Sequence, residues 1–88
     1  MHAVVFVVDM KEGWEGNAES ELDQVVGMLK SVPGYVRGTW ANDETTGISF
    51  ILFESEEVAR GVAENASMPP DASVTVRSAA VYEVARDA

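Results

Sequence analysis

The chain contains no cysteine, and this absence excludes several classes of protein. Without cysteine there is no disulfide scaffold, no thiolate ligand for zinc or an iron–sulfur cluster, and no cysteine nucleophile. The chain has a single histidine, His2, which argues against a transition-metal site because imidazole is the other main protein ligand for such metals. We therefore expect no transition metal, although carboxylates alone can hold a hard cation, and we predict no cofactor.

Basic residues are also scarce, with 6 Lys and Arg against 15 Asp and Glu and a formal net charge of −9. This balance argues against nucleic acid and against an anionic membrane surface, because both are bound through Lys and Arg. The longest apolar run, residues 3–8, is far too short to cross a membrane. No basic segment precedes that run, so we expect no signal peptide and a cytoplasmic location.

What the chain does have is the composition of one small globular domain. It is 88 residues long, 47% of them apolar and 24% charged, so two separate cores would each be too small. Residues 1–88 are therefore expected to form a single domain.

Apolar periodicity predicts four strands and two helices. Asn17 and Ser55 are each followed by glutamates, which is typical of a helix start. Pro33 and Gly34 are expected to end the first helix, and residues 68–71 break the chain after the second. The expected elements are strand 3–8, helix 17–32, strands 35–41 and 48–53 joined by a polar turn, helix 55–66 and strand 74–84.

This order predicts an α+β fold of the ferredoxin-like split βαβ type (βαββαβ), with a four-stranded antiparallel sheet. The first and third strands are expected at the centre, with both helices on one face. Both faces of the first strand are apolar, because Val4 and Phe6 alternate with Val5 and Val7. Since an open apolar face is unfavourable in water, the pattern predicts a homodimer packed through its sheet faces. A monomer with a half-apolar face is the alternative.

Two segments resemble the dimeric α+β barrel superfamily, and its antibiotic-biosynthesis monooxygenase-like branch in particular. They are Val32-Pro33-Gly34-Tyr35-Val36 and Phe53-Glu54-Ser55-Glu56-Glu57-Val58-Ala59. The resemblance covers nearly the whole chain. It implies a homodimer with a pocket between helices and sheet. The members of the superfamily include cofactor-independent oxygenases that act on aromatic compounds.

The chain departs from that family pattern in two places. Many oxygenase members carry Trp where this chain has Phe53, and the haem-degrading members need a histidine that residues 59–66 lack. Haem degradation is therefore not expected. Three other families with this strand order are RNA-recognition domains, metal chaperones and acylphosphatases, and this chain lacks the residues that each of them requires. An amino-acid-binding regulatory domain remains a possible alternative.

The aromatic residues are the first candidates for a ligand site. Trp40 can stack on an aromatic ligand and Tyr35 can donate a hydrogen bond, and their spacing of five predicts opposite faces of one strand. Trp14, in the first loop, is a candidate lid. Each of these residues would equally serve as a packing residue without a ligand.

The remaining candidates carry a charge or a hydroxyl group. Arg37 and Arg77 can each clamp a carboxylate or an enolate, although ion pairing with the acidic surface would satisfy them equally. His2, the single imidazole of the chain, can reach a pocket mouth from the first strand, although a frayed terminal position would explain it equally. Tyr82 on the last strand is a comparable candidate. In the last strand we expect Val74, Val76, Ala80, Tyr82 and Val84 on one side, with Arg77 and Glu83 on the other.

These residues favour a small-molecule-binding protein. One form of it is a cofactor-independent monooxygenase-like enzyme acting on an aromatic or enolisable substrate. No nucleophile elbow, phosphate-binding loop or spaced pair of carboxylates marks a catalytic centre, so the residues alone leave open whether the protein is an enzyme. The alternative is a non-catalytic module for ligand sensing or assembly.

Overall fold

A computed structural model describes residues 1–16, 18–68 and 71–88 of the chain. The expected cap at Asn17 and the chain break at Pro69 and Pro70 lie outside the described residues. The elements in chain order are β1 (His2–Met10), η1 (Trp14–Gly16), α1 (Ala18–Lys30), β2 (Tyr35–Asn42), β3 (Thr46–Phe53), α2 (Glu56–Glu64) and β4 (Val74–Glu83).

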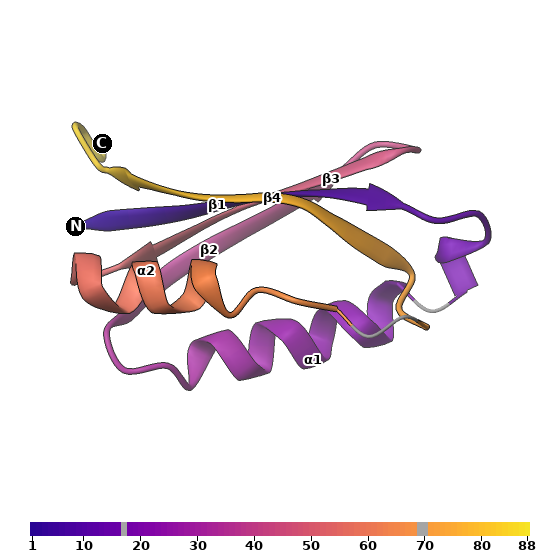
Figure 1. Ribbon diagram of the computed structural model, residues 1–88, viewed down its shortest axis with the longest axis horizontal. Coiled ribbons are helices and arrows are strands. Elements are labelled where there is room, and N and C mark those ends of the chain that lie inside the picture. Colours follow the sequence, from indigo (N-terminus) through magenta and orange to yellow (C-terminus); the bar gives the residue numbers. More distant parts are fainter. Residues whose placement is uncertain (17, 69–70) are drawn as a thin grey trace.

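The four strands form one antiparallel sheet in the order β2-β3-β1-β4, and both helices lie on the same side of it (Figure 1). The α+β class and the strand-and-helix order predicted from the sequence are therefore confirmed, and they are compatible with a ferredoxin-like fold. The two most apolar strands, β1 and β3, are at the centre as predicted. We call the surface beneath the helices the helix face and the opposite surface the open face.

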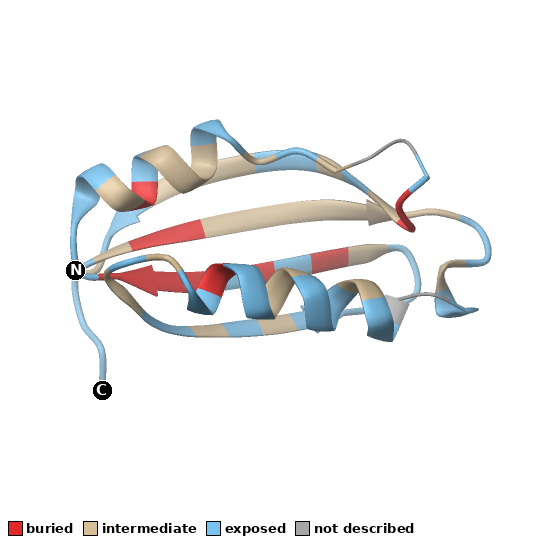
Figure 2. Ribbon diagram, turned by 90° about the horizontal axis from the view of Figure 1, so that it is seen from below, coloured by how far each residue is buried: buried red, intermediate tan, exposed pale blue. Residues whose placement is uncertain are grey.

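The core lies between the helix face and the two helices. Val4, Ile51 and Phe53 come from the central strands, and Leu29 and Ala59 come from α1 and α2. Figure 2 shows that the buried residues of the two central strands lie mainly at the end near the N-terminus. The core is small because side chains alternate along a strand, so each strand supplies it with only every second residue.

The two helices differ in how they meet the sheet. The predicted N-cap of α2 is confirmed, because the Ser55 hydroxyl accepts a hydrogen bond of 3.2 Å from the backbone N–H of Val58. In α1, Leu29 is buried but Leu22 is exposed, although their spacing places both on one side of the helix. The burial on α1 therefore favours its C-terminal half.

A register shift in β2 corrects one prediction. Tyr35 pairs with Phe53 and Arg37 pairs with Leu52, so Val36 is an extra residue on β2, and Trp40 pairs with Ser49. Because this β-bulge reverses the alternation once, Tyr35 and Trp40 lie on the same face, the helix face, and the prediction of opposite faces is wrong.

A second register shift corrects the predicted sides of β4. Val7 pairs with Ser78 and Val8 pairs with Val76, so the alternation reverses around Arg77. Val76 therefore lies on the helix face, whereas Tyr82, which pairs with Ala3, lies on the open face. The prediction that Val76 and Tyr82 share a side is therefore wrong. The prediction that Arg77 and Glu83 share a side is also wrong, because Arg77 is on the open face and Glu83, which pairs with His2, is on the helix face.

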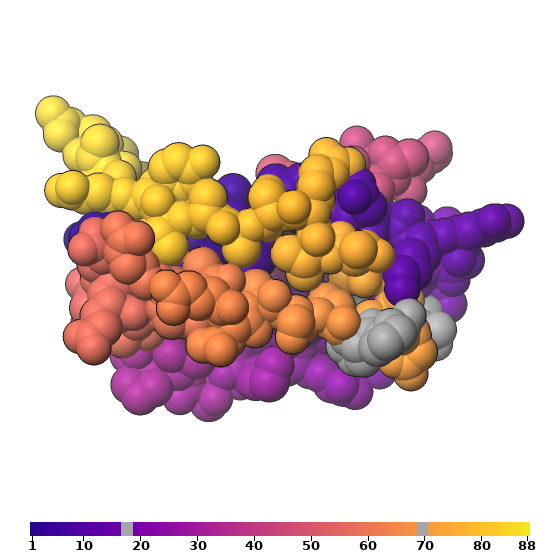
Figure 3. Space-filling model, viewed as in Figure 1, coloured from indigo at the N-terminus to yellow at the C-terminus, as the bar shows by residue number. Residues whose placement is uncertain are grey.

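The open face carries large apolar side chains in contact with solvent. Ile48 and Phe50 on β3 are 54% and 46% exposed, and Tyr82 on β4 is 58% exposed. In the space-filling view the C-terminal residues extend from the sheet on this same side, away from the helices (Figure 3). Every helix of the described residues is too short or too polar to cross a membrane.

Candidate functional site

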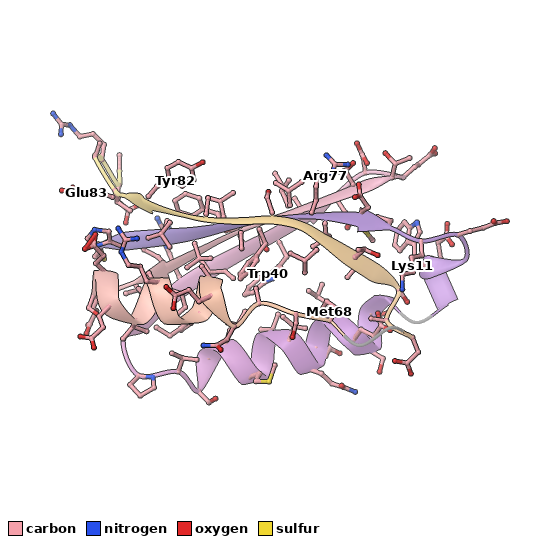
Figure 4. The ribbon with its side chains drawn as sticks, in the orientation of Figure 1. Lys11, Trp40, Met68, Arg77, Tyr82 and Glu83 are labelled. Carbon is pink, nitrogen blue, oxygen red and sulfur yellow. The ribbon has the colours of Figure 1, made fainter. Side chains whose placement is uncertain are left out.

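Trp40 occupies the layer between the sheet and the helices (Figure 4). A methyl group added at Gly38 would come within 2.5 Å of the Cη2 atom of Trp40, so the indole ring folds back over Gly38. Glycine is needed here because any side chain would displace the ring. The sequence Gly38-Thr39-Trp40 thus sets the direction of the indole.

The indole of Trp40 is half-buried and packs against the core residues. Within the described part of the chain its N–H group makes no hydrogen bond to protein. Met68 lies in the same layer in Figure 4. An aromatic face together with a free N–H donor is an arrangement that can stack on a planar ligand and bind one of its oxygens.

Tyr35 is at the other end of the same surface. Its ring meets Phe53 edge to face, with ring centroids 6.2 Å apart and an angle of 77° between the planes. Its register partner on β3 is four residues from that of Trp40, which corresponds to about 13 Å along a strand. Tyr35 and Trp40 therefore share the helix face but not a single contact point.

Arg37 and Arg77 lie on the open face, each in an ion pair. Arg37 binds the carboxylate of Asp87 near the C-terminus, and Arg77 binds Asp9 at the end of β1. The hydrogen bond and the negative charge of Asp9 raise the pKa of the Arg77 guanidinium above its usual value. The structure thus separates both arginines from Trp40 and places them on the face of the sheet that also carries Tyr82.

His2 lies at the start of α2 rather than in the layer around Trp40. Its Nε2 atom is 3.5 Å from a carboxylate oxygen of Glu56, which also accepts a hydrogen bond of 3.3 Å from Arg60. Glu56 and Arg60 are in the i,i+4 arrangement at which opposite charges on a helix can pair. A protonated His2 would share one carboxylate with an arginine, so this cluster is suited to local ion pairing.

Trp14, the candidate lid, makes one side-chain hydrogen bond within the described chain. Its indole N–H donates a hydrogen bond of 3.2 Å to the carbonyl oxygen of Glu44 in the turn between β2 and β3. That turn is held by Asp43, whose carboxylate accepts hydrogen bonds from the backbone N–H groups of Thr45 and Thr46. These bonds lower the pKa of Asp43. Trp14 therefore joins the first loop to the end of the β2–β3 hairpin.

Two surface hollows lie outside this set of residues. One, of about 530 Å³, is lined by Gly16, Glu19, Ser20, Asp23 and Gln24. Another, of about 320 Å³, is lined by Arg60, Ala63, Glu64, Ala79 and Val81. Neither contains a ligand residue predicted from the sequence. The described residues also hold no group of three or more metal-ligating side chains.

Two contacts that sequence reasoning missed join distant parts of the chain. Glu21 of α1 accepts hydrogen bonds of 3.1 and 3.2 Å from the backbone N–H of Ser73. Asp87 reaches Arg37 from the last residues of the chain. Neither contact has a local signal, because about fifty residues separate the partners in each case.

Comparison with known proteins finds no family model that matches this chain and no curated protein of similar sequence. Function is therefore argued from the residues and their geometry.

Proposed function

We propose that this protein binds a small aromatic or enolisable molecule and acts as a homodimer joined through its open sheet faces. The main support for the ligand site is the position of Trp40, which lies on the helix face with an indole N–H that makes no hydrogen bond to the described residues. The core cluster that it packs against is apolar, so a planar ligand would lose water contacts on binding and gain a stacking partner.

The resemblance to the monooxygenase-like branch adds a finer proposal about chemistry. In it, substrate and molecular oxygen meet in the layer around Trp40 without a cofactor, and the indole orients the substrate by stacking and by one hydrogen bond. A cytoplasmic location belongs to the same proposal. Uptake of oxygen in the presence of a bound substrate is the measurement that separates an enzyme from a binding protein.

Surface area supports the dimer. The chain exposes 5898 Å² of accessible surface. A monomeric globular protein of 9.5 kDa exposes roughly 5,050 Å², so the chain exposes roughly 850 Å² more than its mass predicts. One partner of a standard interface buries about 800 Å². The excess is therefore about the area that one dimer contact would cover, and the open face carries the exposed Ile48, Phe50 and Tyr82.

The ligand site can be tested with the two tryptophans of the chain. Trp14→Phe leaves Trp40 as the single tryptophan, and Trp40→Phe leaves Trp14. We expect naphthol or naphthoquinone to quench the emission of Trp40 with a saturating curve, and to leave that of Trp14 unchanged apart from collisional quenching. Equal, non-saturating quenching of both variants would contradict the ligand site.

The exposed apolar side chains of the open face also support a second candidate function, a non-catalytic assembly module. In that case the open face would act in association and the layer around Trp40 would only be core. The same fluorescence experiment separates the two functions, because an assembly module retains its oligomeric state but shows no saturable quenching of Trp40.

A further inference from the structure

The C-terminal segment, residues 84–87, crosses the sheet from one edge to the other. β4 is an edge strand and still pairs with the start of the chain at Val84, whose N–H donates to the carbonyl oxygen of Met1 at 3.0 Å. Three residues later, Asp87 forms its ion pair with Arg37 on β2, the opposite edge strand. The three strand spacings between these edges amount to about 14 Å, a distance that the segment and the Arg37 side chain can span together.

Burial along β3 differs between the two ends of the open face. Leu52 and Phe50 both point to the open face, yet Leu52 is 1% exposed and Phe50 is 46% exposed. Ala3, the β1 partner of Leu52, is 0% exposed, and the β2 partner of Leu52 is Arg37. Figure 2 shows the C-terminal segment running past this end of the sheet. One end of the open face is therefore covered and the other is not.

We propose that residues 84–87 are a detachable strap that competes with a second copy of the chain for the open face. The proposal rests on the proposed dimer, in which two open faces pack together. A second sheet cannot contact Leu52 and Ala3 while the strap lies over them. Full association therefore requires the ion pair between Arg37 and Asp87 to open in both chains.

The strap is held weakly enough to be displaced. Arg37 and Asp87 have side chains 62% and 34% exposed, and exposed ion pairs are easily broken because water and salt screen them. Because a dimer opens two straps, loss of both ion pairs should tighten association by about two- to thirty-fold. High salt should act in the same direction.

Two variants remove the strap in different ways. Deletion of residues 85–88 removes the strap beyond Val84, which keeps its hydrogen bond to Met1. The formal side-chain charge does not change, because Arg86 and Asp87 leave together. Asp87→Asn keeps the segment and removes only the ion pair. Asp23→Asn, at an exposed position on α1, is the matched control for the loss of one negative charge from a chain of net charge −9.

Sedimentation equilibrium gives the dissociation constant of each dimer, and the NMR shifts of the Leu52 methyl groups report on the strap in dilute monomer. We expect the deletion to lower the dissociation constant relative to the wild-type chain, and Asp87→Asn to lower it relative to Asp23→Asn. Both variants should also move the Leu52 signals. A dissociation constant that is unchanged or raised would overturn the competition. Moved Leu52 signals without association of any variant would overturn it together with the dimer, whereas association with unmoved Leu52 signals would overturn the strap alone.

Discussion

Replacing Gly38 by alanine tests where the indole of Trp40 lies. The added methyl group would come 2.5 and 2.7 Å from two carbons of the ring, well inside van der Waals contact. The backbone at Gly38 accepts alanine, because Gly38 is not among the glycines with positive φ in the described chain, which are Gly13 and Gly34. The cost of the substitution therefore comes from displacing the ring of Trp40.

Overpacking of this kind lowers the free energy of unfolding by about 1–3 kcal/mol. In a Trp40→Leu background the two ring carbons are gone, and the same Gly38→Ala change should then raise the free energy of unfolding by about 0.4–1 kcal/mol, because alanine restricts the unfolded chain. The sign of the effect is thus expected to reverse between the two backgrounds.

Urea unfolding followed by far-ultraviolet circular dichroism measures all four proteins of this cycle without relying on tryptophan emission. Gly61→Ala in α2 is the matched control: no atom lies within 4 Å of the added methyl group, so we expect a gain of about 0.5–1 kcal/mol. If Gly38→Ala has the same effect on the free energy of unfolding in both backgrounds, Trp40 does not lie over Gly38. The proposed ligand site in the layer around Trp40 would then lose its main support.

Three further predictions concern the contacts that hold the elements in place. Ser55→Ala removes the cap of α2 and should lower the free energy of unfolding by about 1 kcal/mol in urea. Asp43 has a lowered pKa in the folded chain, so its stabilisation is complete above its ordinary pKa of 3.8 and is lost as the pH falls through the folded value; Asp43→Ala should flatten this part of the acid unfolding curve. Glu21→Ala leaves the N–H of Ser73 without its carboxylate and should lower the free energy of unfolding by about 1–3 kcal/mol, measured in urea.

Matched changes at exposed positions serve as controls for these three variants. Ser67→Ala, Asp23→Asn and Glu12→Ala alter the same residue types on the surface and should change the free energy of unfolding by less than about 0.5 kcal/mol. Equal effects of a variant and its control would show that the cap, the turn or the carboxylate contact contributes nothing specific.

The sequence predicted the elements well because their signals are local. The apolar runs of β1 and β3, the glutamates after Ser55 and the polar turn between β2 and β3 are each signals within a few residues, and each produced the expected element. The central position of the first and third strands followed from the βαββαβ order of the elements, and the apolar character of these two strands agrees with it.

The faces of β2 and β4 could not be read from the sequence. A β-bulge adds one residue to one strand, and a shift of one residue moves every following side chain to the opposite face. No residue type around Val36 or Arg77 marks these bulges, so Tyr35 was assigned to the wrong face relative to Trp40, and Tyr82 was grouped wrongly with Val76.

The contacts of Glu21 and Asp87 were missed for a different reason. Each pairs with a group about fifty residues away, and only the folded sheet brings the partners together. Sequence reasoning identified Arg37 as a candidate that an acidic partner would satisfy equally, but it could not identify which carboxylate that would be.

The mass of the particle in solution tests the central claim, the dimer through the open face. Sedimentation velocity of the wild-type chain at tens of micromolar is expected to show a species of twice 9.5 kDa. Phe50→Glu, which places a charge on the open face, should return it to a single chain, whereas Met28→Glu, at a 67% exposed apolar position on α1, should remain dimeric. A wild-type chain that sediments as one 9.5 kDa particle, or a dimer that Phe50→Glu leaves intact, would contradict the account.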